Sequence, residues 1–246
     1  MSRSIVRAYA EAITRGDWKT THEGIAFDSN GTLVDGQHRL AAIIEADTPV
    51  ELIVFTDVPA DTFDVLNTGK KRNGADTLAI EGEKNSHLLA AMIRAVYLYD
   101  HRPEGAWSGT GARLTNHQIL QTLEAHPRLR EFVPIAERIA SATSMIKSAA
   151  GAAAYLTERN NAHRDLSEWY DGITEGAGLA RQDPRLTFRN HMLKLAKHEV
   201  GAGQKRRETR EHVALYVTAF NSWIAGETLP RLRYDQRQPL PPVHKG

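Results

Sequence analysis

GIAFDSNGTLVDGQHRLAA, the stretch from Gly24 to Ala42, decides the fold of the first third of the chain. Two short apolar runs in it flank Asn30-Gly31, a dipeptide that is the strongest short-range signal for a β-hairpin. The second strand is broken at Gly36, and apolar residues then recur at helical spacing from Gln37 to Ala46. We therefore expect a hairpin that leads directly into a helix.

The junction between that hairpin and that helix combines residues suited to binding phosphate. The first N–H groups of a helix lack partners inside the helix, and the helix dipole adds positive potential there. Gly36 lets the backbone approach an anion, and the guanidinium of Arg39 can donate two hydrogen bonds to phosphate oxygens. Gln37 and His38 add donors, and His38 can also move a proton near neutral pH. Asp35 can cap the helix or bind a divalent metal ion, which makes Asp35 and His38 the candidate catalytic residues.

The pattern outside this stretch predicts an α+β fold. We expect a mixed sheet-and-helix unit over residues 1–82, a mostly helical part over 83–229 and an extended tail with Pro and Arg over 230–246. A buried-type strand is expected over 50–55. Helices are expected over 4–16, 60–66, 74–80, 86–99, 116–125, 128–140, 144–158, 166–173, 185–197 and 206–225.

Composition excludes several classes of function. The 246 residues include no cysteine, so disulfides, thiolate metal sites and cysteine nucleophiles are excluded. No apolar run approaches the roughly 20 residues that a membrane span needs. The chain enters an amphipathic pattern directly after Ser4, without an apolar signal segment, so we expect a cytoplasmic protein without membrane contact.

Positive charge is concentrated in the last quarter of the chain. From Arg185 onward there are twelve Lys and Arg against five Asp and Glu, whereas the whole chain carries a net charge of only +1. This distribution fits either a polyanionic partner or ordinary solvated helix faces. The candidate nucleic-acid contacts open the last long helix: Lys205, Arg206, Arg207 and Arg210. Tyr234 can stack on bases, whereas Tyr216, Phe220 and Trp223 follow helical spacing that favours the core.

A second basic run follows the expected helix over 60–66. It comprises Thr68, Gly69, Lys70, Lys71 and Arg72. These residues can bind the phosphates of a nucleotide or of DNA, or they can form a solvated turn. The spacing excludes a Walker A loop. Histidines also occur along the helical part, where we interpret them as polar surface side chains: His117, His126, His163, His191, His198 and His212.

Residues 24–42 resemble the "DGQHR" signature of the ParB/sulfiredoxin-like superfamily, and in particular the ParB N-terminal-like proteins of actinobacterial phages and mobile elements. Three flanking segments are similar to the same group. They are Gly16-Asp17-Trp18, the run from Phe63 to Arg72, and Ala219 to Trp223 followed by Gly226. The specific motifs lie within the first 80 residues.

The resemblance implies a site for a nucleoside triphosphate, ATP or CTP, with Mg²⁺ as a possible companion. By position in the motif, Gly36, Gln37, His38 and Arg39 would contact the phosphates. Glu23 is a candidate for the glutamate that assists hydrolysis in some relatives. The absence of cysteine excludes sulfiredoxin activity. This chain lacks the relatives' first strand and a clear helix-turn-helix domain, so we expect a more open pocket and no centromere-type DNA recognition.

Three functions remain open on these grounds. The first is a nucleotide-binding, ParB-like protein that acts on or with DNA, with a second copy of the chain as a candidate partner in a homodimer. The second is a metal-dependent NTPase or nuclease that uses the same pocket, with Asp35 on the metal ion and His38 in acid–base chemistry. The third is a non-catalytic phage protein that binds a host protein through its helical part.

Overall fold

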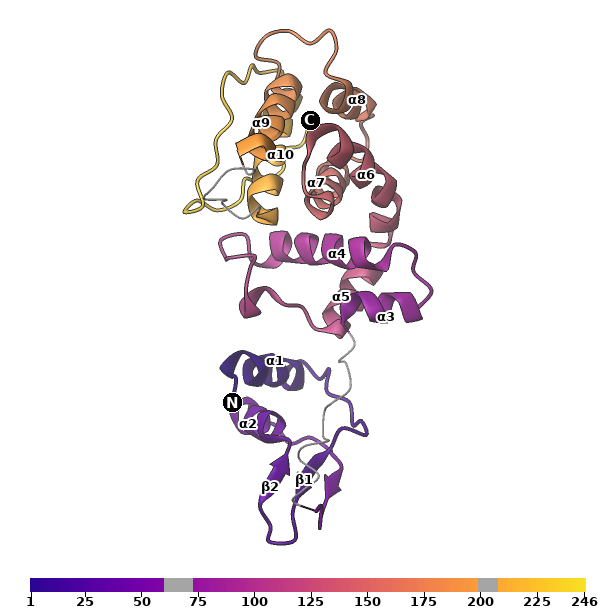
Figure 1. Ribbon diagram of the computed structural model, residues 1–246, viewed down its shortest axis with the longest axis vertical. Helices are drawn as coiled ribbons and strands as arrows, with labels where there is room; N and C mark the ends of the chain where they lie inside the picture. The colour runs from indigo at the N-terminus through magenta and orange to yellow at the C-terminus, as the bar shows by residue number, and fades with distance from the viewer. Residues whose placement is uncertain (60–72, 199–207) are drawn as a thin grey trace. The chain divides into compact units, whose positions relative to one another are not determined.

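The computed structural model describes residues 1–59, 73–198 and 208–246. It divides into two compact units, Met1–Lys71 and Arg72–Gly246 (Figure 1). The expected boundary at residue 82 is corrected, because α3 (Gly74–Ile80) belongs to the second unit. Leu78 of α3 is fully buried in the core of the helical unit. The expected helix over 60–66 lies outside the described residues.

The sheet of the first unit is small and mixed. It contains β1 (Ile25–Phe27), β2 (Leu33–Asp35) and β3 (Val54–Phe55) in the order β2-β1-β3. β1 pairs antiparallel with β2 and parallel with β3. In the hairpin turn, the carboxylate of Asp28 accepts hydrogen bonds from the backbone N–H groups of Asn30 and Thr32. The bond from Thr32 is the main reason why the pKa of Asp28 is lowered.

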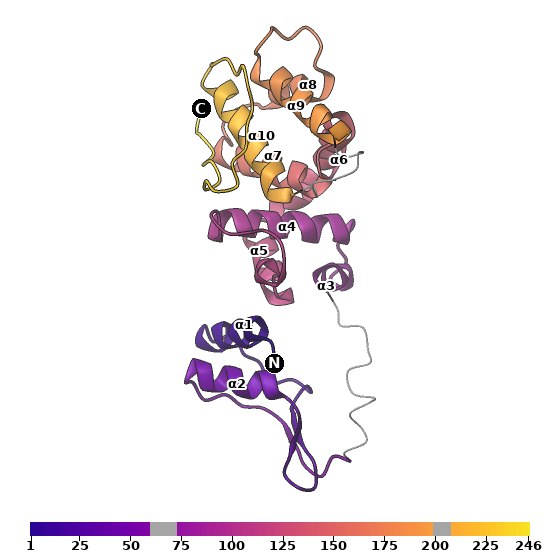
Figure 2. The same ribbon diagram turned by 60° about the vertical axis from the view of Figure 1, so that its left-hand side comes forward.

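Two helices complete this unit, α1 (Arg3–Thr14) and α2 (Gln37–Ala46), and they lie side by side (Figure 2). Their shared core is small: Val6, Ala10 and Ile13 of α1 pack with Ala42 of α2. The hairpin followed at once by a helix is confirmed. Because this core is so small, single changes at the strand-to-helix junction are expected to matter more here than in the larger unit.

The expected strand over 50–55 is only partly confirmed. The observed strand β3 is two residues long, and its side chains are exposed rather than buried: Val54 is 51% exposed and Phe55 46%. The physical reason is its position at the edge of the sheet, where only one neighbouring strand covers it. An apolar run alone does not distinguish an edge strand from a central one.

The second unit is helical, as expected. Its helices are α3, α4 (Ser86–His101), α5 (Asn116–Ala125), α6 (Phe132–Thr143), α7 (Lys147–Asn160), α8 (Ser167–Glu175), α9 (Pro184–His198) and α10 (Thr209–Ile224), with 3-10 turns η2 (Thr110–Ala112) and η3 (Pro127–Glu131). The helix expected over 128–140 is in fact η3 followed by α6. Within the described residues, no helix is long and apolar enough to cross a membrane.

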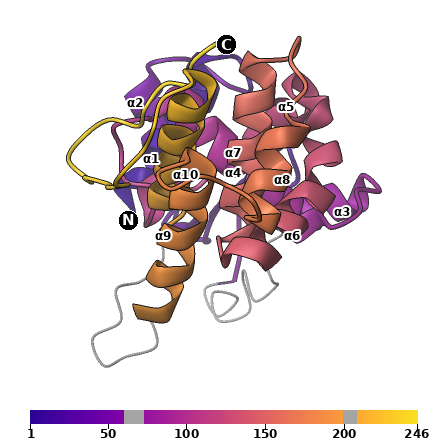
Figure 3. The same cartoon turned by 90° about the horizontal axis from the view of Figure 1, so that it is seen from above.

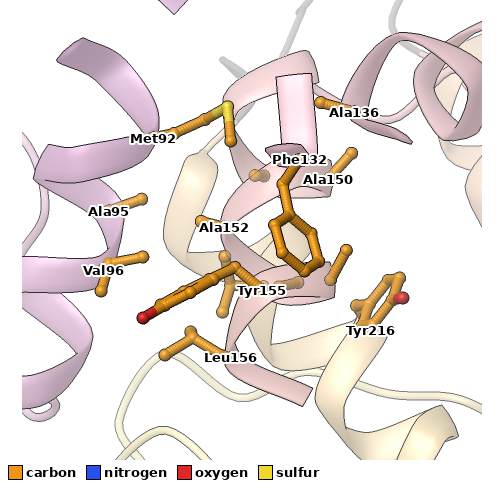
Figure 4. Close-up of a cluster of buried hydrophobic side chains, with 14 of the residues drawn as sticks. Met92, Ala95, Val96, Phe132, Ala136, Ala150, Ala152, Tyr155, Leu156 and Tyr216 are labelled. Carbon is orange, nitrogen blue, oxygen red and sulfur yellow. The ribbon is translucent and has the colours of Figure 1, made fainter. Parts of the chain in front are cut away.

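Helix α7 forms the centre of the helical core, and α4, α6 and α10 pack around it (Figure 4). Every residue from 149 to 157 is buried. The small side chains of α7 let its neighbours approach closely. A Cβ atom at Gly151 would lie 2.6 Å from the Met92 methyl carbon and 2.9 Å from the Ala136 Cβ. The packing of α4 and α6 therefore depends on the absence of a side chain at this point.

Aromatic side chains of α8, α9 and α10 form the other part of the core. Trp169 is fully buried, and its indole N–H donates a hydrogen bond to the Tyr216 hydroxyl at 2.7 Å. Phe220 meets the Trp169 ring edge-on, with centroids 5.3 Å apart, and Trp223 is partly buried beside it. The core position of Tyr216, Phe220 and Trp223 is confirmed.

The last segment, residues 230–246, has no helix or strand but is no separate tail. We call it the strap, because it runs over the outside of the helical unit beside α10 (Figure 3). Leu232, Leu240 and Val243 of the strap are buried in the helical core. The extended backbone agrees with the expectation. The expectation of a separate tail over residues 230–246 is corrected, because these three buried apolar side chains attach the strap to the helical unit.

Candidate functional site

Gly36 forms the junction between β2 and α2. It is the N-cap of α2, with a left-handed backbone at φ 100°, and no side chain caps this helix. A Cβ atom at this position would lie 2.4 Å from the Ile25 Cγ2 atom. The turn therefore requires glycine for both its backbone conformation and its contact with β1. Asp35 is the last residue of β2 and does not cap the helix, which corrects one of its expected roles.

Arg39 connects the start of α2 to the hairpin. Its guanidinium donates to the Gly24 carbonyl at 2.8 Å and to the Glu23 carboxylate at 3.0 Å, and the Asp35 carboxylate lies 3.7 Å away. Only 14% of the Arg39 side chain is exposed. The charge of Arg39 lies at the turn as expected, but it already has protein partners. Glu23, which motif comparison only suggested, is brought directly to the site.

His38 links the two helices of the first unit. Its Nε2 atom accepts a hydrogen bond at 2.9 Å from the backbone N–H of Ser2, which is the N-cap of α1. The N-termini of α1 and α2 therefore meet at this contact. Gln37, in the first turn of α2, is exposed beside it. No local pattern predicts the approach of Ser2 to His38, because the two residues are 36 positions apart.

Two helix N-termini at one place make a favourable environment for an anion. Neither α1 nor α2 has a side-chain hydrogen bond at its N-cap, so their first N–H groups are directed outward. Both helix dipoles add positive potential at the same point. The hydroxyls of Ser2 and Ser4, 3.0 Å apart, add further hydrogen-bonding groups. This arrangement can bind a phosphate group through backbone and hydroxyl donors.

A shallow groove of about 350 Å³ lies elsewhere on the same two helices. It is lined by Arg7, Ala10, Glu11, Thr14 and Arg15 along α1 and by Glu45 and Ala46 at the C-terminal end of α2. Gly36 and His38 are not among the residues that line this groove.

The carboxylates near the turn are Asp35 and Glu23. Their side chains are 39% and 60% exposed, and both lie against Arg39. In the part of the chain that the structure describes, no three His, Asp or Glu side chains are grouped as metal ligands. Mg²⁺ that accompanies a nucleotide is usually held by one or two carboxylates together with phosphate oxygens. The two exposed carboxylates fit such a partial ligand set.

The remaining predicted site residues lie elsewhere. Thr68 to Arg72 and Lys205 to Arg207 fall outside the described residues. Arg210 is described, and its assignment to nucleic acid is corrected: it is only 5% exposed, and its guanidinium donates to the carbonyls of Pro103 and Gln238. Basic residues at the start of a helix suggest a solvated patch, but here the strap covers Arg210.

A polar cluster that sequence reasoning missed connects α4, α5 and α7. The Nδ1 atom of His126 lies 2.8 Å from the Tyr155 hydroxyl, and its Nε2 atom lies 3.8 Å from the Asp100 carboxylate. Arg159 forms two hydrogen bonds of 2.8 Å with Asp100. Burial, followed by the charge of Arg159, lowers the pKa of His126 below its ordinary value of 6.5. His126 is therefore partly buried, with 23% of its side chain exposed, and the interpretation as a surface side chain is wrong for His212, which is 1% exposed.

The lowered pKa of His126 predicts a loss of stability in acid. The unfolded chain takes up a proton at this histidine more readily than the folded chain, so stability falls as the pH decreases below about 6.5. Urea unfolding between pH 7.5 and 5.5 should show a steeper loss for the wild type than for His126→Gln, whose side-chain amide can still form a hydrogen bond with Tyr155 but does not titrate. Parallel curves for the two proteins would contradict this prediction.

Comparison of the chain with models of known families, with curated proteins and with solved structures found no match. The function is therefore inferred from the residues of the Gly36 turn and from the helix ends that meet there.

Proposed function

We propose that this protein binds a nucleoside triphosphate, ATP or CTP, at the junction of α1 and α2 and that it acts with DNA. The observation that carries the nucleotide site is the meeting of two helix N-termini at the contact between Ser2 and His38. Two uncapped helix starts supply several N–H donors and positive potential at one place. The resemblance of residues 24–42 to the ParB/sulfiredoxin-like signature supports the same site.

The roles of the turn residues follow from their surroundings. Gly36 holds the turn in a left-handed conformation, so that the first N–H groups of α2 are directed outward. Gln37 is exposed and is in a position to donate to phosphate oxygens. Arg39 is held by Glu23 and lies beside Asp35, so it acts mainly by fixing the hairpin to the start of α2. Asp35 and Glu23 would hold Mg²⁺ with the phosphates.

Binding fits the geometry better than turnover does. The lone pair of His38 at Nε2 already accepts the Ser2 N–H, so this atom is not available to take a proton from a water molecule. The Asp35 carboxylate lies 3.7 Å from the Arg39 guanidinium, so it already has a charged partner in the protein. We therefore place nucleotide binding before an NTPase or nuclease activity.

Replacing Gln37 with Glu tests the site without damaging the helix. A carboxylate in the first turn stabilises a helix by about 0.3–1 kcal/mol through the dipole. The same carboxylate repels phosphate, so we expect nucleotide affinity to fall roughly tenfold or more. Calorimetric titration of the wild type and Gln37→Glu with Mg·ATP and Mg·CTP measures the binding, and thermal unfolding measures the stability.

Gln121→Glu is the matched control, because Gln121 is exposed on α5 in the other unit and the substitution changes the charge equally. This variant should bind nucleotide as the wild type does. Absence of binding to ATP and CTP by the wild type would refute the proposal. Equal affinities of the wild type and Gln37→Glu would place the nucleotide elsewhere.

A further inference from the structure

The strap is held to the helical unit by one buried cation, Arg210. The guanidinium of Arg210 donates to the carbonyls of Gln236 at 3.2 Å, Gln238 at 2.7 Å and Pro103 at 2.9 Å. It also donates to the Tyr234 hydroxyl and lies over the Tyr234 ring. Arg210 therefore fixes the middle of the strap against α10 and against the segment that follows α4.

The end of the strap is fixed as well. The side chain of Asn221 donates to the Pro242 carbonyl at 2.8 Å and accepts from the His244 N–H at 2.9 Å. Asn161 donates to the His244 carbonyl at 3.0 Å. Side-chain hydrogen bonds and buried apolar residues hold the extended backbone in place. The strap therefore loses its conformational entropy during folding, and a partner that binds it does not have to order it.

The arginines of the strap are directed away from this fixed backbone. Arg231 and Arg233 are exposed on either side of Leu232, which is 3% exposed. In an extended chain, residues two apart lie on the same side, roughly 6.6 Å from each other. Arg237 is exposed further along the strap. Among the described residues, no carboxylate forms an ion pair with any of these three arginines.

Two acidic groups at the strap accept hydrogen bonds. Asp235 accepts a hydrogen bond from the backbone N–H of Arg237 at 3.0 Å, and Glu208 accepts one from the Gln236 amide at 2.9 Å. Arg231, Arg233 and Arg237 thus present guanidinium groups to solvent on a rigid backbone. Such groups form bidentate, charge-assisted hydrogen bonds with phosphate oxygens.

We propose that Arg231, Arg233 and Arg237 form a surface that binds the phosphate backbone of duplex DNA. This inference rests on the DNA part of the proposed function but not on the nucleotide site. Arginine rather than lysine in all three positions favours phosphodiester recognition. Leu232, Leu240 and Val243 of the strap are buried, so these aliphatic side chains are not available for insertion into a lipid bilayer.

The test is the binding of a fluorescein-labelled 20-base-pair duplex, followed by fluorescence anisotropy at several salt concentrations. The variant carries Arg231→Gln, Arg233→Gln and Arg237→Gln together. We expect it to bind at least about tenfold more weakly. The slope of the logarithm of the binding constant against the logarithm of the salt concentration should become less steep by about 2–3, since each lost phosphate contact reduces this slope by about 0.9. A control that carries Lys84→Gln, Arg113→Gln and Arg138→Gln has the same net charge and should bind as the wild type does.

Equal losses in the two triple variants would overturn the inference, because they would reflect net charge alone. No loss in the strap variant would place the DNA contact elsewhere and leave the DNA part of the proposed function intact. Absence of duplex binding by the wild type would refute both this inference and the DNA part of the proposed function. The nucleotide site would still be tested separately, by the calorimetric titration of the wild type and Gln37→Glu. Tighter binding to anionic lipid vesicles than to duplex, lost in the strap variant, would overturn the assignment to DNA.

Discussion

Gly36→Ala is expected to destabilise the N-terminal unit by about 2–5 kcal/mol, since a left-handed backbone costs about 1–2 kcal/mol for a residue with a Cβ and overpacking adds about 1–3. The overpacking arises because the new methyl group would lie 2.4 Å from the Ile25 Cγ2 atom and 3.0 Å from the Ile25 Cα atom. The Ile25 backbone is held in β1 between two strands, so it cannot move away easily. In a unit with so small a core, this loss is a large part of the total stability.

The indole N–H of Trp18 offers a local measurement of this effect. It donates to the Glu51 carbonyl at 3.0 Å and therefore reports on the fold of the N-terminal unit. In ¹H–¹⁵N spectra recorded during urea unfolding, the folded Trp18 signal of Gly36→Ala should disappear at a lower urea concentration than that of the wild type. Nucleotide binding should weaken in parallel, because the N–H groups of α2 lose their position.

Gly31→Ala separates the two causes. Gly31 also has a left-handed backbone, at φ 78°, but no atom lies within 4 Å of the position that its Cβ would take. This variant should show the conformational cost alone and lose clearly less stability than Gly36→Ala. Equal losses in both variants would show that the contact with Ile25 contributes nothing.

Arg210→Gln is expected to destabilise the helical unit by about 2–4 kcal/mol, because hydrogen bonds from a charged donor are worth about 1.5–3 kcal/mol and their loss leaves buried carbonyl groups without donors. The Pro103, Gln236 and Gln238 carbonyls would lose their shared guanidinium. The Nε–H of Arg210 is itself buried without a partner among the described residues, which reduces the net loss somewhat. Urea unfolding followed by circular dichroism measures the change.

Release of the strap should also be visible by proteolysis. Trypsin cleaves after arginine, and Arg231, Arg233 and Arg237 are protected only while the strap backbone is held in place. Arg210→Gln should therefore be cut in the strap at protease concentrations that leave the wild type intact. Arg138→Gln is the control, since Arg138 forms an exposed ion pair with Asp171 that is worth less than about 1 kcal/mol. Equal stability and equal cleavage of the two variants would contradict the assignment of Arg210 to the strap.

The local sequence pattern was sufficient to predict the hairpin, α2 and most helices of the second unit. The dipeptide Asn30-Gly31, the break at Gly36 and the helical spacing of apolar residues act over a few residues, so their effects can be read from the chain itself. The core positions of Tyr216 and Phe220 followed from the same spacing. The glycine N-cap of α2 was likewise predictable, because it depends on the strand break and on the first turn of one helix.

Three features were decided only by the tertiary structure. They are the edge position of β3, the burial of Arg210 and the contact between Ser2 and His38. Each depends on which distant segment lies next to a residue: a missing neighbouring strand for β3, the strap for Arg210 and the N-cap of α1 for His38. The sequence by itself determined the local elements and the chemistry of the DGQHR turn, because backbone preference and side-chain type act locally. Long-range packing determined which charges remain available to a ligand, because burial and hydrogen bonding are set by neighbours that are remote along the chain.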